Sequence, residues 1–146
     1  MAVEFDFSLE KVLKVRNIRE DKALNKFVQA RQKLRKIEEK LENKVSEQKE
    51  LYDYIRNNNL PPETALYTRN CLYDNRKDIK KIRDELSAQM EKVEKFQKNF
   101  IEKRQKREAI DKLKDKEYEK FTKEYLHKEQ IEVDDMAQHI NNKLGV

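Results

Sequence analysis

Glycine and proline are almost absent from this chain, and their scarcity restricts the possible folds more than any other feature. The only glycine is Gly145, and the only prolines are Pro61 and Pro62. Neither residue type occurs anywhere from Glu63 to Lys143. A sheet protein or a compact α/β domain needs many turns, which Gly and Pro commonly form. The sequence therefore predicts an all-α protein with few chain reversals.

One break interrupts the helical pattern, at residues 57–62, where three Asn and two Pro occur together. Asn is unfavourable inside a helix and Pro cannot be accommodated there, so this segment is expected to form a turn. Ser8 precedes the first helical segment, and its hydroxyl can cap the free N–H groups at a helix start. We expect a single coiled-coil unit over residues 1–146, with one helix at about 8–57, a turn at about 58–62 and a second helix at about 63–142.

Apolar residues recur at alternating steps of three and four on both sides of the break, which is the heptad pattern of a coiled coil. The first track consists of Phe27, Ala30, Leu34, Ile37, Leu41, Lys44, Gln48, Leu51 and Ile55. The second consists of Ala65, Thr68, Leu72, Asn75, Ile79, Ile82, Leu86, Gln89, Val93, Phe96 and Phe100, and a poorer continuation of Lys103, Arg107, Ile110, Lys114, Glu117 and Phe121. Val45 is an alternative to Lys44, and choosing it would insert a stutter that locally unwinds the supercoil.

The short turn makes the two helices antiparallel neighbours. Residues that face each other should then have numbers that add up to about 120, which places Leu34 opposite Leu86. The predicted fold is a long antiparallel two-helix coiled-coil hairpin with the second helix overhanging. Residues 113–146 are expected to have no partner within the chain. A new apolar stripe in this overhang needs another protein, a second copy or a fold-back to cover it: Leu126, Gln130, Val133, Ala137, Ile140 and Leu144.

No arrangement of residues points to catalysis, a cofactor or a metal. Cys71 is the only cysteine, and no Gly-rich phosphate loop is present. Glu124 and His127 have the spacing of half a di-iron site, but such a site needs a second copy of the motif on a facing helix. The N-terminus lacks the basic start of a signal peptide, and no apolar stretch is long enough to span a membrane. We expect a soluble intracellular protein without enzymatic activity.

Charge is distributed unevenly along the chain, which has a net charge of +5. Residues 10–37 contain ten Lys and Arg against three acidic residues, whereas residues 129–146 contain one Lys against four acidic residues. The basic run is interpreted either as the solvated exterior of a coiled coil or as a docking surface for an acidic partner. Nucleic acid is disfavoured as the partner, because the basic residues are interleaved with Glu and lack an aromatic platform for stacking bases.

Tyrosines gather on both sides of the predicted turn. Tyr is common at interface hot spots, and it can also flank and shield a coiled-coil contact line. Both interpretations remain open for this cluster of Tyr52, Tyr54, Tyr67 and Tyr73.

The two ends of the chain carry patterns that resemble a known family. The N-terminal pattern is Phe5-Asp-Phe7-Ser-Leu9-Glu-Lys-Val12-Leu13-Lys-Val-Arg16, followed by Arg19-Glu20 and Ala23. The C-terminal pattern comprises Lys112-Leu113-Lys-Asp-Lys116-Glu-Tyr118, Glu129-Gln130 and Asp134-Asp135-Met-Ala137. They resemble the opening and closing patterns of the flagellar FliJ family, although Asp135 stands where that family often has Glu. Length and hairpin plan are similar over the whole chain, and related type III secretion proteins share this plan.

The resemblance implies a non-enzymatic protein whose coiled coil is similar to the rotor stalk of rotary ATPases. The implied partners are the flagellar export ATPase ring, the cytoplasmic part of the membrane export gate and the export chaperones, with no small-molecule substrate. The implied location is the cytoplasm, peripherally at the inner face of the cell membrane. Candidate ATPase contacts are the basic residues Arg16, Arg19, Arg31, Lys33 and Arg35, and candidate gate contacts are Gln48, Tyr52 and Tyr73. The alternatives are a structural coiled-coil scaffold or dimer without an export role, and a nucleic-acid-binding coiled coil.

Overall fold

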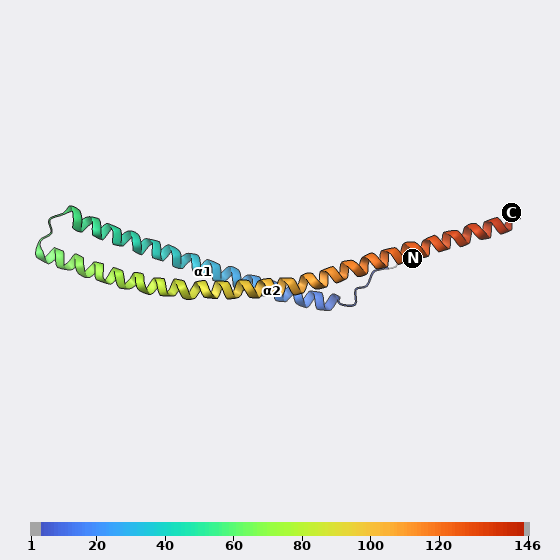
Figure 1. Cartoon of the computed structure of the whole chain (residues 1–146), viewed down its shortest axis with the longest axis horizontal. Helices are drawn as coiled ribbons and strands as arrows, with labels where there is room; N and C mark the ends of the chain where they lie inside the picture. The colour runs from blue at the N-terminus through green and yellow to red at the C-terminus, as the bar shows by residue number, and fades with distance from the viewer. Residues whose placement is uncertain (1–3, 145–146) are drawn as a thin grey trace. The chain divides into compact units, whose positions relative to one another are not determined.

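The structure, a computed structural model, describes residues 4–144 and consists of two long helices. Helix α1 spans Glu10–Asn57 and helix α2 spans Pro62–Lys143. The chain reverses between them, so that the helices run antiparallel (Figure 1). The described residues contain no strand. The prediction of an all-α two-helix hairpin is confirmed.

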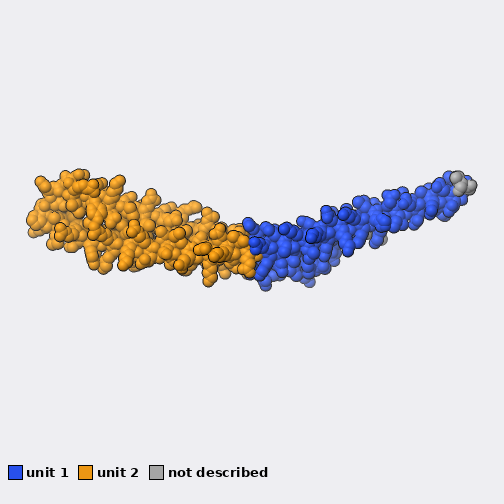
Figure 2. All heavy atoms as spheres, in the orientation of Figure 1, with its two compact units in different colours: residues 1–20, 103–146 blue, residues 21–102 orange. Residues whose placement is uncertain are grey.

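The described residues divide into two compact units, which are coloured separately in Figure 2. Unit 1 combines residues 1–20 with residues 103–146, and unit 2 is residues 21–102. Each unit contains a part of both helices. The expectation of one coiled-coil unit stays a prediction, and the two units are described separately below.

The helix ends follow from local hydrogen bonding. Helix α1 begins two residues after Ser8, where the backbone N–H of Glu10 donates to the carbonyl of Phe7 at 3.1 Å. At its other end, Nδ2 of Asn58 donates to the carbonyl of Tyr54 at 3.1 Å and satisfies an acceptor that the helix itself leaves unpaired. Helix α2 begins at Pro62, which suits the first helical position because its missing N–H has no helical partner there.

Unit 2 is held together by one line of contact between α1 and α2. Such a line of contact is called the seam, in this unit and in unit 1. Every predicted seam position from Phe27 to Leu51, and from Ala65 to Phe100, is buried or half-buried. Lys44 is half-buried whereas Val45 is 41% exposed, so the heptads continue without a stutter and the Val45 alternative is wrong. The most buried apolar side chains are Ala23, Ala30, Leu72, Ile79 and Ile82.

Three buried polar residues interrupt this apolar seam. Nε2 of Gln89 donates to the carbonyl of Ala30 at 3.0 Å, and Nδ2 of Asn75 donates to the carbonyl of Lys44 at 3.0 Å. The third is Thr68, whose hydroxyl bonds the carbonyl one turn earlier at 2.8 Å. Each cross-helix pair joins residues whose numbers add up to about 120, the register expected for this hairpin.

Unit 1 has a small apolar cluster formed by Phe7, Leu13 and Ile110. Beyond it, the ring of Phe5 lies 5.3 Å from that of Tyr118 and 5.4 Å from that of Phe121. The segment before α1 is therefore extended along α2.

This arrangement corrects the expected start of the overhang at residue 113. An extended segment advances about 3.3 Å per residue against about 1.5 Å in a helix, so a few residues cover several turns of α2. The covered part of α2 reaches Phe121, and every residue from 122 to 144 is exposed.

Candidate protein-interaction surfaces

Basic side chains from both helices meet in unit 1. The guanidinium of Arg16 is turned toward α2, where Nη1 donates to the carbonyl of Lys106 at 2.8 Å. With Arg19 and Lys103 these residues line a depression of about 120 Å³. Two of the predicted ATPase contacts, Arg16 and Arg19, thus lie together. Helix α2 adds Lys103 and Lys106, which were not among the predicted contacts.

Ion pairs occupy the seam next to this depression. Nε and Nη2 of Arg107 donate to the carboxylate of Glu20 at 2.6 and 3.1 Å, and Nη1 donates to Asp111 at 2.7 Å. The hydrogen bond with Glu20, and after it the one with Asp111, raises the pKa of Arg107 above its usual value. Farther along, Nζ of Lys114 lies 2.9 Å from the carboxylate of Glu10. Specific charge pairs therefore hold the part of the seam that looked poorest in sequence.

A second basic surface lies in unit 2, on one side of its seam. It is a groove of about 460 Å³ whose charged rim is formed by Lys26, Lys33, Lys92 and Lys95. Lys26, Lys92 and Lys95 were missed as candidates, although the antiparallel register places Lys92 and Lys95 opposite Lys26.

The opposite side of that seam has a different character. A depression of about 370 Å³ there is lined by Leu34, Met90, Glu91 and Glu94, among others. Arg31 does not line the basic groove: its guanidinium carbon lies 5.5 Å from the centre of the Phe27 ring. Arg35 is exposed and also lies outside the groove. Of the three predicted contacts in this stretch, only Lys33 belongs to the basic groove.

The predicted gate contacts differ in accessibility. Gln48 is half-buried in the seam. Tyr52 is half-buried and its hydroxyl accepts a hydrogen bond from Arg76, whose guanidinium also lies 5.6 Å from its ring centre. Tyr73 is 61% exposed, and Leu66 and Tyr67, nearer the start of the same helix, are 60% and 71% exposed. We call Leu66 and Tyr73, which are seven residues apart on one face of α2, the turn-end patch, and Leu66 is the member that the sequence interpretation overlooked.

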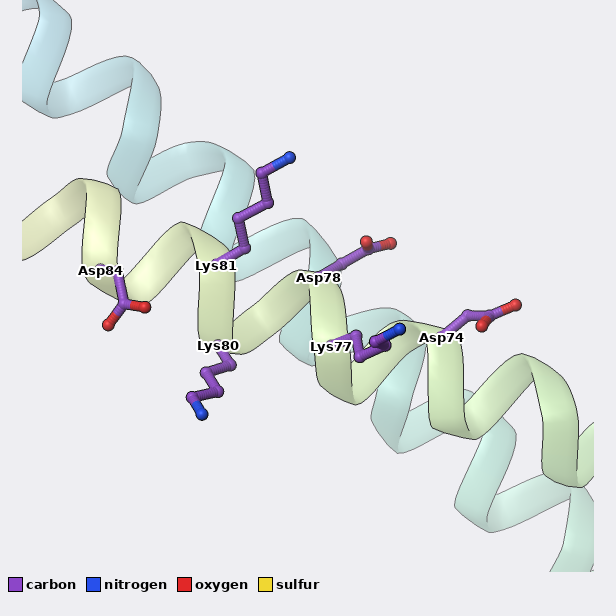
Figure 3. A pocket seen from close by; sticks show the side chains of 6 residues that line it. All are labelled: Asp74, Lys77, Asp78, Lys80, Lys81 and Asp84. Carbon is purple, nitrogen blue, oxygen red and sulfur yellow. The ribbon is translucent and has the colours of Figure 1, made fainter.

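Figure 3 shows a charged stretch of α2 formed by Asp74, Lys77, Asp78, Lys80, Lys81 and Asp84. All six side chains are exposed, and Lys80 and Asp84 point away from the side on which Asp78 and Lys81 lie (Figure 3). They diverge instead of converging on one point, so this stretch is a solvated helix face. On the facing helix α1, Nζ of Lys44 lies 3.3 Å from the carboxylate of Glu47 on the same helix and 3.3 Å from the carboxylate of Asp78 on α2. Hydrogen bonds to these two carboxylates raise the pKa of Lys44 above 10.5.

Residues 4–144 contain neither a candidate metal site nor a candidate membrane span. No cluster of three or more His, Cys, Asp or Glu side chains there could hold a metal ion. No helix in this part of the chain is both long and apolar enough to cross a membrane.

Comparison with known families identifies the chain. The family model described as Flagellar FliJ protein matches residues 5–143. The chain belongs to the FliJ family. FliJ proteins are non-catalytic components of flagellar protein export, so this chain is a coiled-coil protein of that apparatus. A comparison with curated proteins finds no match, and neither does one with solved structures.

Proposed function

We propose that this FliJ-family chain is the stalk that links the export ATPase ring to the cytoplasmic part of the membrane export gate, and that it escorts export chaperones. The proposal rests on family membership together with one structural observation. The molecule has two kinds of exposed surface, one basic and one formed by Tyr and Leu. Two surfaces of different chemistry suit a protein that holds two different partners.

The basic surfaces are the proposed ATPase contacts. In unit 1 these are Arg16 and Arg19 with Lys103 and Lys106, and in unit 2 the groove that includes Lys33. Cations gathered in a depression attract an acidic partner more strongly than the same charges scattered over a surface, because their potentials add. Arg31 and Arg35 are exposed and remain candidates at the edge of this contact.

The turn-end patch is the proposed gate contact. Tyr and other large side chains that are more than half exposed are frequent at interface hot spots. Tyr73 is the proposed centre, whereas the half-buried Gln48 and Tyr52 are proposed to position it from within the seam. A gate contact would hold the protein peripherally at the inner face of the cell membrane.

The experiment for the ATPase arm is a binding assay with the purified ATPase at several salt concentrations. The test variant is Lys26→Glu/Lys33→Glu, and the matched control is Lys77→Glu/Lys80→Glu, two exposed lysines outside the groove. We expect the test variant to bind weakly at low salt and the difference to shrink at high salt, since exposed charges are screened over about 8–10 Å. Equal binding of test and control variants at every salt concentration would overturn this arm.

The gate and chaperone arms are tested with the same protein. Leu66→Ala/Tyr73→Ala should reduce binding to the soluble part of the gate and leave ATPase binding intact. Circular dichroism provides the folding control, and Leu113→Ala on unit 1 is the matched truncation. Co-purification with export chaperones should persist in the ATPase variant if escort uses a separate surface. Retention of the chain on DNA in preference to the ATPase would instead favour the nucleic-acid alternative.

A further inference from the structure

The free end of α2 carries an apolar stripe that no described residue covers. We call residues 122–144 the tail, and all of its side chains are exposed. Five large apolar side chains in it are more than half exposed and recur at helical spacing: Leu126, Val133, Met136, Ile140 and Leu144. An apolar surface of this kind marks a contact site when it is rimmed by charged residues, as it is here.

The stripe does not continue the seam of unit 1. The seam positions Ile110, Lys114 and Phe121 continue in steps of three and four at Glu124, Lys128, Ile131 and Asp135, which are mostly charged. Leu126 and Val133 lie two residues after Glu124 and Ile131, which is about 200° around the helix. The stripe therefore faces away from the side on which the N-terminal segment packs. Helix α2 runs without Gly or Pro to Lys143, so it has no break at which the tail could fold back.

The start of α1 exposes a surface of complementary character, which we call the N-terminal patch. Val12, Val15 and Ile18 are 38%, 46% and 54% exposed, and Lys11, Lys14 and Lys22 beside them are also exposed. Lys11, Val12 and Val15 line a depression of about 310 Å³ with Arg16 and Arg19. Among residues 4–144, none of these three lysines forms an ion pair.

The tail and the start of α1 are opposite in charge. The tail reads Glu132-Val133-Asp-Asp135-Met136, and the start of α1 reads Lys11-Val12-Leu-Lys14-Val15. Both have the order charged, apolar, any, charged, apolar, with acids in one and lysines in the other. Side by side and parallel, the two helices would bring Val133 next to Val12 and the acidic segment of the tail close to the basic start of α1.

We propose that the tail of one copy packs on the N-terminal patch of a second copy, and that the second tail packs reciprocally on the first copy. A two-fold axis makes both contacts identical and closes the pair, so the assembly is a dimer and not a filament. Two tails packed on each other antiparallel would instead bring their acidic segments, residues 129–135, together. Like charges in such proximity disfavour that arrangement.

The dimer goes beyond the proposed function and does not depend on it. It covers Arg16 and Arg19, which are also proposed ATPase contacts, so dimer and ATPase complex exclude each other.

The test is the oligomeric state of the full chain by light scattering and sedimentation at low salt. The tail variant is Glu132→Lys/Asp135→Lys, the patch variant is Lys11→Glu/Lys14→Glu, and the control with two reversed exposed charges is Glu38→Lys/Glu42→Lys. We expect the tail variant and the patch variant, each measured alone, to have a dimer dissociation constant about tenfold higher than that of the parent. The dissociation constant of the control variant should be unchanged. A mixture of tail and patch variants should form a heterodimer of parental affinity. Monomers at every concentration in the parent would overturn the proposal, as would a tail variant that dimerises more tightly than the parent.

Cross-linking locates the contact in a Cys71→Ser background, which removes the only native thiol. Mixing Val12→Cys and Val133→Cys chains should give a disulfide between two copies, because a bridge requires Cα atoms within about 7 Å. Pairing Val133→Cys with a Leu66→Cys chain is the negative control. A dominant bridge between two Val133→Cys chains would show that tails pair with each other and overturn the proposal. A bridge inside a monomeric chain that carries both Val12→Cys and Val133→Cys would show a fold-back and overturn it too.

Discussion

The guanidinium of Arg107 and the carboxylate of Glu20 form a two-point hydrogen-bonded pair in the seam of unit 1, with N–O distances of 2.6 and 3.1 Å. Their side chains are only 25% and 14% exposed, at positions that an ordinary coiled coil fills with apolar residues. A half-buried pair of this geometry contributes specificity of register, because neither charge finds an equivalent partner if the helices slide.

The first prediction concerns this pair. Arg107→Met alone should lower the free energy of unfolding by about 2 kcal/mol, since the carboxylate of Glu20 loses a charge-assisted partner while half-buried. The double variant Glu20→Leu/Arg107→Met should recover most of the loss, because two apolar side chains suit the seam. Urea unfolding followed by circular dichroism measures both. A double variant no more stable than Arg107→Met would contradict the prediction.

The second prediction concerns Asn75, whose Oδ1 is buried without a hydrogen-bond partner in the described part of the chain. Asn75→Leu should stabilise the hairpin by about 1 kcal/mol, because it removes this unsatisfied acceptor and adds apolar contact. Asn70→Leu, at an exposed position of the same helix, is the matched control and should change stability by less than about 0.5 kcal/mol. The measurement is the urea midpoint. A destabilised Asn75→Leu protein would mean that this amide contributes more than it costs.

Periodicity predicted the seam well, because burial in a coiled coil depends on spacing more than on the polarity of each residue. Lys44, Asn75 and Gln89 were all placed in the seam by their spacing, and all three are buried or half-buried there. Spacing could not predict the path of Phe5, because an extended segment has no helical period and its partner is chosen by tertiary packing. Of the four lysines at the rim of the basic groove only Lys33 was a predicted contact, and Lys92 and Lys95 join it through the pairing of the two helices.

The third prediction is a pH dependence located at Lys44, whose pKa is raised above 10.5 by its hydrogen bonds to Glu47 and Asp78. A raised folded-state pKa means that the stabilising contribution is complete below 10.5 and is lost as the pH rises through the folded-state value. The difference in urea midpoint between parent and Lys44→Met should therefore shrink as the pH rises beyond 10.5. Lys40→Met, which removes an exposed lysine, is the control and should show a smaller change. A difference between parent and Lys44→Met that stays constant across this range would contradict the assignment.

The last prediction concerns the segment before α1, which covers α2 in place of a longer first helix. Phe7 is 4% exposed and packs with Leu13 and Ile110, while Phe5 lies against Tyr118 and Phe121. Phe5→Ala/Phe7→Ala should reduce the local opening free energy of residues 110–121 by about 3 kcal/mol, which is about a hundredfold faster amide exchange. Hydrogen exchange is measured at a protein concentration low enough to keep the chain monomeric.

The tail serves as the internal reference in the same experiment. No segment within residues 4–144 covers residues 122–144, so the amides of this tail should already exchange fast in the parent and should not change in the variant. The seam of unit 2 should keep its protection, because neither Phe lies in that unit. Unchanged protection of residues 110–121 would show that α2 is stable there without its cover. Equally strong protection of tail and seam in the parent monomer would show that another part of the chain packs on the tail.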